Sequence, residues 1–332
     1  MKILIDHQLP FLLAHGGLQI QIERTKKSLE ATGTQVEYLR WWDDTQKGDI
    51  IHFFGRANPS HIEFAHSKGM RYVMSELLTG QGSRTLKQLR FQGAFERILR
   101  RFVHAPFLAS FRWDAYQKAD ACIVLTKWEA EVTRLLFSPP AHRLHVVPNG
   151  VEQEFFTDPG NLVQRGDELV CTATITERKR VLELAEAAVA ARLPVRVLGN
   201  PYGKDDPYYR RFLALTEQHP DVVRYAGAVS DRSELARIYQ SARGFVLLST
   251  MESLSLSALE AAASGCPLLL SDLPWARCTF GRSATYCPIG DTSSTATVLR
   301  RFYDEAPTLP LPDPPCHWED VANQLVRIYQ EM

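Results

Sequence analysis

The feature that most restricts the fold of this sequence is a regular alternation of short apolar segments with amphipathic segments, which runs through the chain twice. The strand-like segments of the first half are residues 2–6, 35–40, 49–55, 71–76, 121–126 and 144–150. Those of the second half are residues 168–175, 194–199, 222–227, 244–249 and 267–271. The intervening stretches repeat apolar residues at helical spacing. Since strand–helix–strand units build parallel sheets, the sequence predicts an α/β protein with two Rossmann-like, doubly wound sheets.

The two halves meet at residues 148–160, where proline, asparagine and glycine combine with acidic residues as they do in turns. A chain of 332 residues is long for one core and comfortable for two domains. We predict a first domain over residues 1–157 and a second over residues 158–310. Residues 311–332 form a proline-rich bridge and one amphipathic helix, which we expect to cross back and pack on the first domain.

Composition narrows the class of protein. Hydrophobic content of 45% and charged content of 23% are those of an ordinary globular chain. No apolar run is long enough to span a bilayer and the N-terminus lacks a signal-peptide pattern, which predicts a cytoplasmic protein. The six cysteines form no Cys-x-x-Cys pair, so neither zinc nor a disulfide framework is expected. The pairs Asp43–Asp44 and Asp205–Asp206 fit solvated turns better than metal ligands.

A local basic segment, residues 84–118, interleaves arginine and lysine with phenylalanine and contains only two acidic residues, Glu96 and Asp114. Such a surface can dock on an anionic membrane, which would place the protein peripherally at the inner face. The alternative, which the sequence favours slightly, is a helix that buries its phenylalanines and solvates its arginines. Nucleic-acid binding is not expected, because the charge is local and no recognition motif accompanies it.

Candidate functional residues lie where strands end, because open α/β sheets bind ligands there. Gly16 and Gly17 open a helix after the first strand, where backbone N–H groups can approach an anion, although glycine pairs usually serve only a turn. Lys179 precedes a helix after the first strand of the second half. The helix dipole disfavours a cation there, so a diphosphate would suit it, whereas the alternative is a solvated lysine between Arg178 and Arg180.

Glu252 and Glu260 frame a segment without other charges. Glu252 follows a strand, and Glu260 falls in the next helix. If that helix begins near residues 253–255, its unpaired N–H groups face the ligand. Eight residues at 3.6 per turn separate the two side chains by about 80°, so both can point the same way. Alternatively, Glu252 is simply favoured by the dipole at the N-terminus of the helix, and Glu260 is an unrelated surface residue.

Six stretches taken together carry a resemblance. They are "GGLQ", "VLTKWEAEVTRLLF" with "HVVPNGVEQEFF", "YAGAVSDRSELARIYQSARGFVLLS", "ESLSLSALEAAASGCPLLLSDLP" and "WEDVANQLVRIY". In this order, over nearly the whole chain, the sequence resembles the family-4 retaining glycosyltransferases of GT-B fold. The resemblance implies two Rossmann-like domains facing a cleft, with the acceptor bound mainly by the first and the nucleotide sugar mainly by the second. It implies transfer from a UDP- or GDP-linked sugar to a hydroxyl of a glycan, lipid-linked or small-molecule acceptor.

The resemblance also implies roles for single residues. Glu252 matches the first glutamate of the family's E-x7-E motif, which holds donor-sugar hydroxyls, and Glu260 matches the second, which binds the ribose. Lys179 matches the lysine that binds the diphosphate. Val229 lies where family members contact the base through the backbone. The remaining expected contacts to the phosphates come from the glycine loop and the helix start, namely Gly16, Gly17, Ser253, Leu254 and Ser255.

The implied chemistry is a front-face reaction with retention of anomeric configuration, in which the leaving phosphate helps to take the acceptor proton. It needs neither metal nor cofactor, because lysine and backbone N–H groups stabilise the leaving group. The sequence departs from the family at Ala173 and Thr174, where glycine and arginine are common, and at Ser253 and Ser255, where glycines are usual.

The family's first-domain histidine is not evident, and Ser75 with Glu76 stands in its place. We assign no general base among His7, His15, His52 and His104. Each of these histidines fits a hydrogen-bonded structural role at least as well. Two alternative functions remain open, a nucleotide-sugar epimerase of GT-B-like fold and a non-catalytic bilobal sugar- or nucleotide-binding protein. The presence of both glutamates with Lys179 argues against the binding protein.

Overall fold

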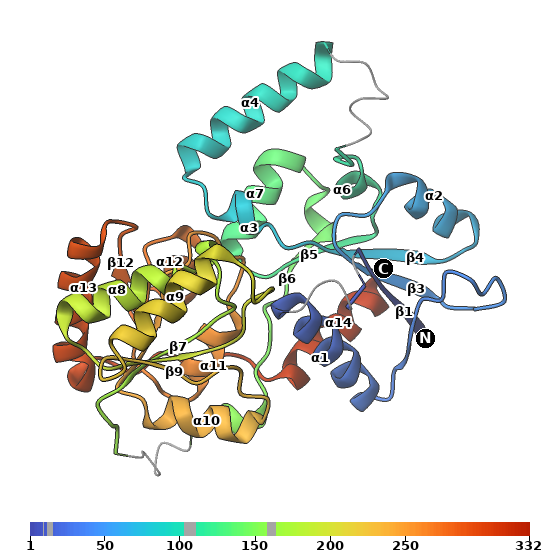
Figure 1. The fold of residues 1–332 in the computed structure, drawn as a ribbon. Coiled ribbons are helices and arrows are strands. Elements are labelled where there is room, and N and C mark those ends of the chain that lie inside the picture. The colour runs from blue at the N-terminus through green and yellow to red at the C-terminus, as the bar shows by residue number, and fades with distance from the viewer. Residues whose placement is uncertain (9, 12–15, 103–110, 158–163) are drawn as a thin grey trace. The chain divides into compact units, whose positions relative to one another are not determined.

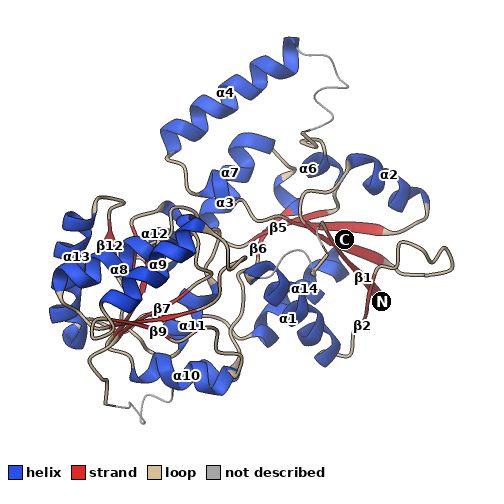
Figure 2. Ribbon diagram, in the orientation of Figure 1, coloured by secondary structure: helices blue, strands red, loops and turns tan. Residues whose placement is uncertain are grey.

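The structure is a computed structural model that describes residues 1–8, 10–11, 16–102, 111–157 and 164–332. The chain forms two compact units, of which unit 1 is Met1–Gly150 with Cys316–Met332 and unit 2 is Val151–Pro315 (Figure 1). Each unit contains a six-stranded parallel sheet flanked by helices (Figure 2). The predicted fold class is therefore confirmed. The sequence placed the boundary between the domains near residue 157.

Unit 1 has the strand order β2-β1-β3-β4-β5-β6, with all neighbours parallel. Its strands are β1 (Lys2–His7), β2 (Gln35–Tyr38), β3 (Ile50–Phe54), β4 (Arg71–Ser75), β5 (Ala121–Val124) and β6 (Leu144–Val146). Its α-helices are α1 (Gly17–Ala31), α2 (Pro59–Ser67), α3 (Thr79–Gly82), α4 (Leu86–Phe102), α6 (Ala115–Lys118), α7 (Lys127–Phe137) and α14 (Trp318–Glu331). The strand order reverses direction between β1 and β3.

Local sequence explains where the helices of unit 1 begin. The Asn58 side chain accepts from Ser60 N at 3.1 Å and caps α2, with proline at the first helical position. Thr126 caps α7 by accepting from Glu129 N at 3.0 Å. The buried Glu129 carboxylate accepts from Leu78 N at 3.1 Å and from Leu125 N at 2.8 Å. This carboxylate therefore satisfies two backbone donors that would otherwise be buried without partners.

The C-terminal helix α14 belongs to unit 1 and packs on α1. It begins against the end of the first chain segment, where a Cβ on Gly150 would lie 2.6 Å from Trp318 N, so only glycine fits at this position. Near its other end, the Tyr329 hydroxyl lies 2.7 Å from His52 Nδ1. The other ring nitrogen, His52 Nε2, lies 2.7 Å from Ser75 Oγ. The last helix thus crosses back to the first sheet, as the sequence predicted.

Unit 2 has the strand order β12-β11-β10-β7-β8-β9, again with all neighbours parallel. Its strands are β7 (Leu169–Thr172), β8 (Val195–Leu198), β9 (Val223–Tyr225), β10 (Gly244–Leu247), β11 (Leu268–Ser271) and β12 (Thr285–Cys287). Its α-helices are α8 (Val181–Ala191), α9 (Pro207–Gln218), α10 (Arg232–Ser241), α11 (Leu256–Ala263), α12 (Pro274–Phe280) and α13 (Thr292–Glu305). The order reverses between β7 and β10, which is the switch point where doubly wound sheets bind ligands.

The sequence did not predict β12, α12 or α13. β12 is only three residues long and lies at the edge of the sheet, so it carries little apolar periodicity. Among the residues that the structure describes, no helix is both long enough and apolar enough to cross a lipid bilayer.

His52 gives unit 1 a pH-dependent stability. Burial lowers the pKa of His52 to about 3, so the folded protein keeps the ring neutral while the unfolded chain binds a proton near pH 6.5. The unfolded state therefore binds more protons between these values, and stability falls as pH falls. We expect the stability advantage of the wild type over His52→Gln to shrink by about 2 kcal/mol from pH 7 to pH 5, measured by urea denaturation. An advantage that does not change with pH would contradict this role.

Candidate functional site

The loops that follow β7 and β10 are bonded to each other at the switch point of unit 2. Thr250 donates to the carbonyl oxygen of Arg178 from its backbone N at 2.8 Å and from its hydroxyl at 3.3 Å. Because β7 and β10 are adjacent parallel strands, both loops leave the same edge of the sheet. Residues far apart in the sequence thus share one site.

Two residues that the sequence singled out separately, Lys179 and Glu252, form an ion pair across these loops. Lys179 Nζ contacts Glu252 Oε1, and the Arg178 guanidinium donates to the same oxygen at 3.2 Å. Arg178 also donates to the carbonyl oxygen of Met251 at 2.7 Å. The Lys179 and Glu252 side chains are largely buried. A carboxylate and two cations are therefore held at the carboxyl edge of the sheet.

Arg180, the next residue along, adopts a left-handed backbone with φ of +52°. This conformation costs a non-glycine residue about 1–2 kcal/mol. Its buried guanidinium donates to the carbonyl oxygen of Gly290 at 2.7 Å, which holds the turn in place. Of these three consecutive basic residues, Arg178 and Lys179 both contact Glu252, whereas Arg180 is directed away to Gly290.

The helix α11 begins at Leu256, and Ser255 caps it by accepting from Ala258 N at 3.4 Å. Glu252 therefore lies in the loop before the helix. The predicted angle of about 80° between Glu252 and Glu260 was wrong, because it assumed that both residues lie on one helix. Between Glu252 and the helix, Ser253, Leu254 and Ser255 are all buried.

Glu260 lies within α11 and has a different set of partners. Arg232 Nη2 donates to Glu260 Oε1 at 2.5 Å and to Glu152 Oε2 at 3.0 Å, and Arg232 Nε donates to Glu152 Oε1 at 3.1 Å. The guanidinium also stacks over the Phe155 ring, 4.6 Å from its centroid. One arginine therefore bridges the second motif glutamate and a carboxylate from the start of unit 2.

Sequence reasoning missed Arg232 and Glu152. A signal for Arg232 was present, because a cation at the first position of a helix opposes the dipole, as it does at Lys179. Burial raises the pKa of Glu260 to about 7, against the lowering effect of Arg232. The arginine thus limits how far this buried carboxylate is driven towards its protonated form.

Two buried hydroxyls near the same edge have no hydrogen-bond partner in the described part of the chain. Ser249 follows β10 and is fully buried, and Thr176 lies in the loop after β7. Buried polar groups are normally hydrogen-bonded, so a polar ligand at this edge would supply what they lack. Within the described ranges, no group of three or more His, Cys, Asp or Glu side chains is placed to hold a metal ion.

The other predicted site residues are distributed over both units. Val229 is half-buried in the loop between β9 and α10 of unit 2. Gly16 and Gly17 are in unit 1, where Gly16 has φ of +140°, a conformation that favours glycine, and Gly17 is the first residue of α1. His15 and His104 lie outside the described residues.

Comparisons with known proteins agree with this arrangement. Residues 166–305 match the family model described as Glycosyl transferases group 1. No curated protein sequence matches the chain. Among solved structures, sucrose-phosphate synthase from Thermosynechococcus elongatus superposes with a TM-score of 0.70 at 16% identity, covering 100% of this chain and 99% of that one.

Two further solved structures illustrate the likeness. HepE from Anabaena in complex with UDP has a TM-score of 0.68 at 13% identity, with 100% of both chains covered. A glycosyltransferase from Rickettsia africae has a TM-score of 0.64 at 11% identity, covering 99% of this chain and 98% of that one. At such identities the likeness shows the fold, which is the GT-B fold that the sequence resemblance implied. Over residues 166–305, the match to the glycosyltransferase model agrees with the sequence resemblance.

Removing Arg232 should leave the carboxylates of Glu152 and Glu260 without the cation that bridges them. We expect Arg232→Met to lower the free energy of unfolding by about 3 kcal/mol, because breaking a buried ion pair leaves an uncompensated charge. The loss should be larger at pH 8 than at pH 6, since the raised pKa of Glu260 lets this carboxyl take a proton at the lower pH. Denaturant titration of both forms measures the difference.

A matched control is Arg277→Met, because Arg277 pairs with Asp272 at the surface and its loss should cost less than about 1 kcal/mol. Adding Glu260→Gln to Arg232→Met should restore part of the lost stability. Equal effects of the Arg232 and Arg277 substitutions would show that the buried bridge has no special role.

Proposed function

We propose that the protein transfers a sugar from a nucleoside-diphosphate-sugar, UDP- or GDP-linked, to a hydroxyl of a glycan, lipid-linked or small-molecule acceptor, with retention and without a metal. The observation that carries this proposal is the ion pair between Lys179 and Glu252 at the switch point of unit 2. The buried Glu260 lies in α11, the helix that follows Glu252. This unit contains the residues that match the glycosyltransferase model. HepE, solved with UDP, supports uridine diphosphate as the first nucleotide to test.

In the proposed complex, Lys179 binds the diphosphate and Glu252 accepts hydrogen bonds from hydroxyls of the donor sugar. Glu260 accepts from the ribose, and the backbone near Val229 contacts the base. The backbone of residues 253–255 and the loop at Gly16 and Gly17 add N–H groups towards the phosphates. The existing contact between Lys179 and Glu252 supports this assignment, because it keeps both side chains at one place before a ligand arrives.

In the proposed transfer reaction, negative charge develops on the leaving nucleoside diphosphate. The bond between the anomeric carbon and the diphosphate oxygen breaks, and the nucleoside diphosphate leaves with an added negative charge. Lys179 and backbone N–H groups stabilise this charge most strongly in the transition state. The acceptor oxygen bonds to the anomeric carbon on the same face, and its proton passes to the leaving phosphate.

Nucleotide binding tests this proposal directly. We expect UDP or GDP to raise the melting temperature of the wild type by mass action. Lys179→Met and Glu260→Gln should each weaken binding in calorimetry by about tenfold or more, because each removes a charge-assisted hydrogen bond. Lys204→Met is the control, since Lys204 is exposed in the same unit and has no assigned role.

If neither nucleotide binds the wild type, or if the Lys179 and Lys204 variants bind equally, the donor site is wrongly assigned. Product analysis then separates the remaining alternatives. An epimerase would change the donor sugar without an acceptor, and a binding protein would leave the donor intact.

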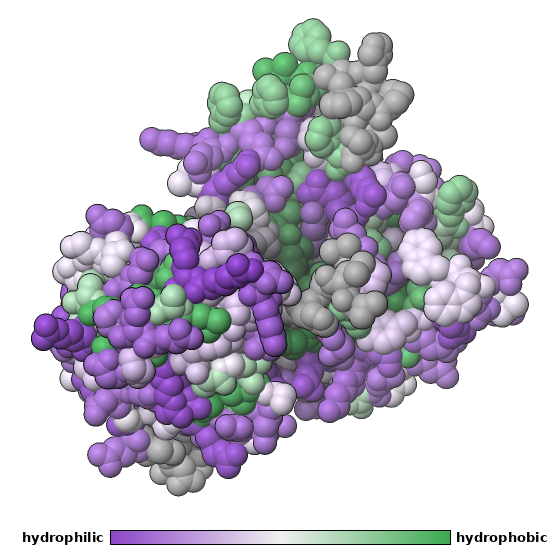
Figure 3. Space-filling model, in the orientation of Figure 1, coloured by the Kyte–Doolittle hydropathy of each residue, from purple (hydrophilic) through white to green (hydrophobic). Residues whose placement is uncertain are grey.

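We further propose that α4 docks on an anionic membrane surface at its cytoplasmic face. Hydrophobic residues gather along α4 at the top of Figure 3. Phe91, Phe95, Ile98 and Phe102 recur at helical spacing and are between 53% and 77% exposed. The alternative that the sequence favoured slightly, phenylalanines buried in a core, does not hold for these residues. Phe107 lies outside the described residues.

Charge identifies the surface that fits α4. The helix packs on α7 through its Gly93 side, where a Cβ would lie 3.3 Å from the Leu135 carbonyl oxygen. The only acidic residue of α4, Glu96, is buried, while basic side chains beside the apolar row are exposed, namely Lys87, Arg90, Arg97 and Arg101. An apolar row flanked by cations matches a lipid surface with anionic head groups better than it matches a second copy of the same basic helix.

Liposome sedimentation distinguishes these partners. We expect the wild type to sediment with phosphatidylglycerol-containing vesicles and less with neutral ones. Arg90→Glu with Arg101→Glu should abolish this binding, and Phe91→Ser with Phe95→Ser should weaken it on both kinds of vesicle. Arg210→Glu, an exposed residue of unit 2, is the control. Unchanged sedimentation of the α4 variants, or dimers that vanish with Phe91→Ser, would reject the membrane as partner.

A further inference from the structure

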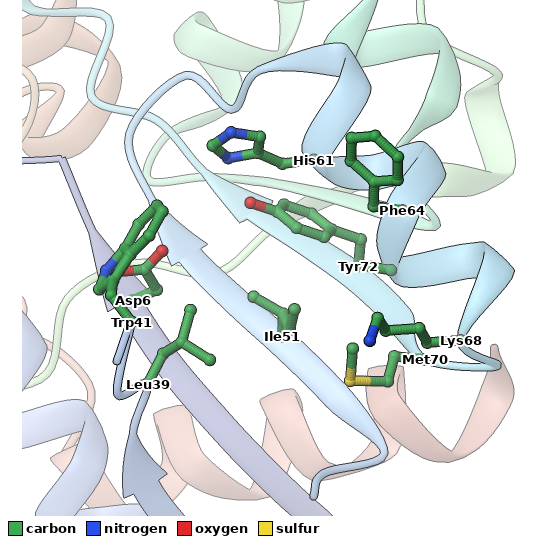
Figure 4. Close-up of a pocket in the computed structure, with 10 residues that line it drawn as sticks. Asp6, Leu39, Trp41, Ile51, His61, Phe64, Lys68, Met70 and Tyr72 are labelled. Atoms are coloured by element: carbon green, nitrogen blue, oxygen red, sulfur yellow. The ribbon is translucent and has the colours of Figure 1, made fainter. Parts of the chain in front are cut away.

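A cavity of about 190 Å³ lies in unit 1, between the sheet and α2 (Figure 4). It exists because the connection from β2 to β3, residues 39–49, is a loop without a helix. The other connections between consecutive strands of this sheet carry helices. A loop covers less of the sheet than a helix does, so the space over β1 and β3 beside α2 is left partly open.

Most of the cavity wall is apolar. The lining includes Leu39 from the loop, Ile51 from β3, and Phe64 and Ala65 from α2. Trp41 forms a further wall although its side chain is largely exposed. Its indole Nε1 donates to Asp6 Oδ1 at 3.2 Å, and its ring contacts the His61 ring with centroids 5.8 Å apart. The indole is therefore fixed in orientation at the edge of the cavity.

Two polar groups in this wall lack partners. Asp6 Oδ1 accepts from His7 N at 2.9 Å as well as from Trp41, but Asp6 Oδ2 has no hydrogen-bond partner in the described residues. The hydroxyl of Tyr72 likewise has none within the described ranges. Asp6 is 6% exposed and Tyr72 is 2% exposed. Figure 4 shows the Tyr72 hydroxyl and an Asp6 carboxylate oxygen pointing towards the same space.

Both atoms face the cavity, so a ligand bound there would take the place of water as their hydrogen-bond partner. Burial also raises the pKa of both Asp6 and Tyr72, which agrees with a site that is poorly solvated. A ligand group that donates one hydrogen bond and accepts another would satisfy both side chains at once. A hydroxyl does this, whereas an ammonium group can only donate.

We propose that this cavity binds a single aromatic ring that carries a phenolic hydroxyl. The ring lies against the apolar wall beside Trp41, and its hydroxyl donates to Asp6 Oδ2 and accepts from the Tyr72 hydroxyl. The size agrees, since an apolar cavity of about 150 Å³ accommodates benzene and a slightly larger one accommodates a substituted ring. The proposal rests on unit 1 alone and does not depend on the transferase activity.

Two other kinds of ligand, a plain hydrocarbon and a pyranose, fit this cavity less well. A plain hydrocarbon would leave Asp6 Oδ2 and the Tyr72 hydroxyl without partners, which is unfavourable. A pyranose carries hydroxyls around its whole ring, and most of them would lose their hydrogen bonds to water without gaining a partner in the apolar wall. The cavity therefore selects an aromatic ring with one polar end.

The probes for the test are p-cresol, toluene and methyl β-glucopyranoside, each titrated into the full-length protein and followed by saturation-transfer NMR and calorimetry. We expect saturable binding of p-cresol, and binding about tenfold or more weaker for toluene and for the glucopyranoside. Tyr72→Phe and Asp6→Asn should reduce p-cresol affinity towards that of toluene while leaving toluene binding unchanged. Ala65→Leu, which fills the cavity, should weaken both aromatic probes.

Tyr72→Phe keeps the shape of the side chain, and Trp41→Ala alters an exposed residue, so at least one variant should fold for comparison. Circular dichroism checks folding before each titration. Absence of saturable p-cresol binding to the wild type would overturn the proposal. Equal affinity for p-cresol and toluene, tighter binding of the glucopyranoside, or p-cresol binding that is unchanged in both Tyr72→Phe and Trp41→Ala would also overturn it.

Discussion

The parallel pairing of β7 with β10 is the constraint on which the candidate donor site depends. Gly244 pairs with Leu169 and Phe245 with Val170, although these strands are separated in the sequence by two strands and three helices. A Cβ on Gly244 would lie 2.7 Å from the Phe302 ring, so the absence of a side chain on this residue of β10 leaves room for Phe302 of α13. This pairing fixes the reversal of strand order, and the reversal brings the two loops together.

Each cation of this site stands near the start of a helix, and each is neutralised by a carboxylate from elsewhere in unit 2. Lys179 precedes α8 and is paired with Glu252, while Arg232 opens α10 and is paired with Glu152 and Glu260. Burying such pairs contributes little net stability, because desolvation offsets most of the attraction. Their placement is better explained by the binding of a charged ligand than by stability.

Unit 1 has the same kind of sheet but several irregular features around it. The loop between β2 and β3 leaves a cavity, and α4 exposes a row of phenylalanines that its packing on α7 does not cover. The last helix is tied to the sheet through Tyr329, His52 and Ser75. His52, which the sequence left open as a ligand-facing or structural residue, is a structural residue here because both ring nitrogens are occupied within the buried core.

Apart from β12, α12 and α13, the sequence by itself determined the strands and helices of the two sheets and the loops in which Lys179 and Glu252 lie, because strand and helix periodicity and capping act between near neighbours. Tertiary structure decided which loops meet. The bridge from Arg232 to Glu152 joins residues 80 positions apart, and the bond from Lys179 to Glu252 joins residues 73 apart. It also decided that Asp6 and Tyr72 face one cavity. These features arise from the packing of strands and loops in three dimensions, which local periodicity does not encode.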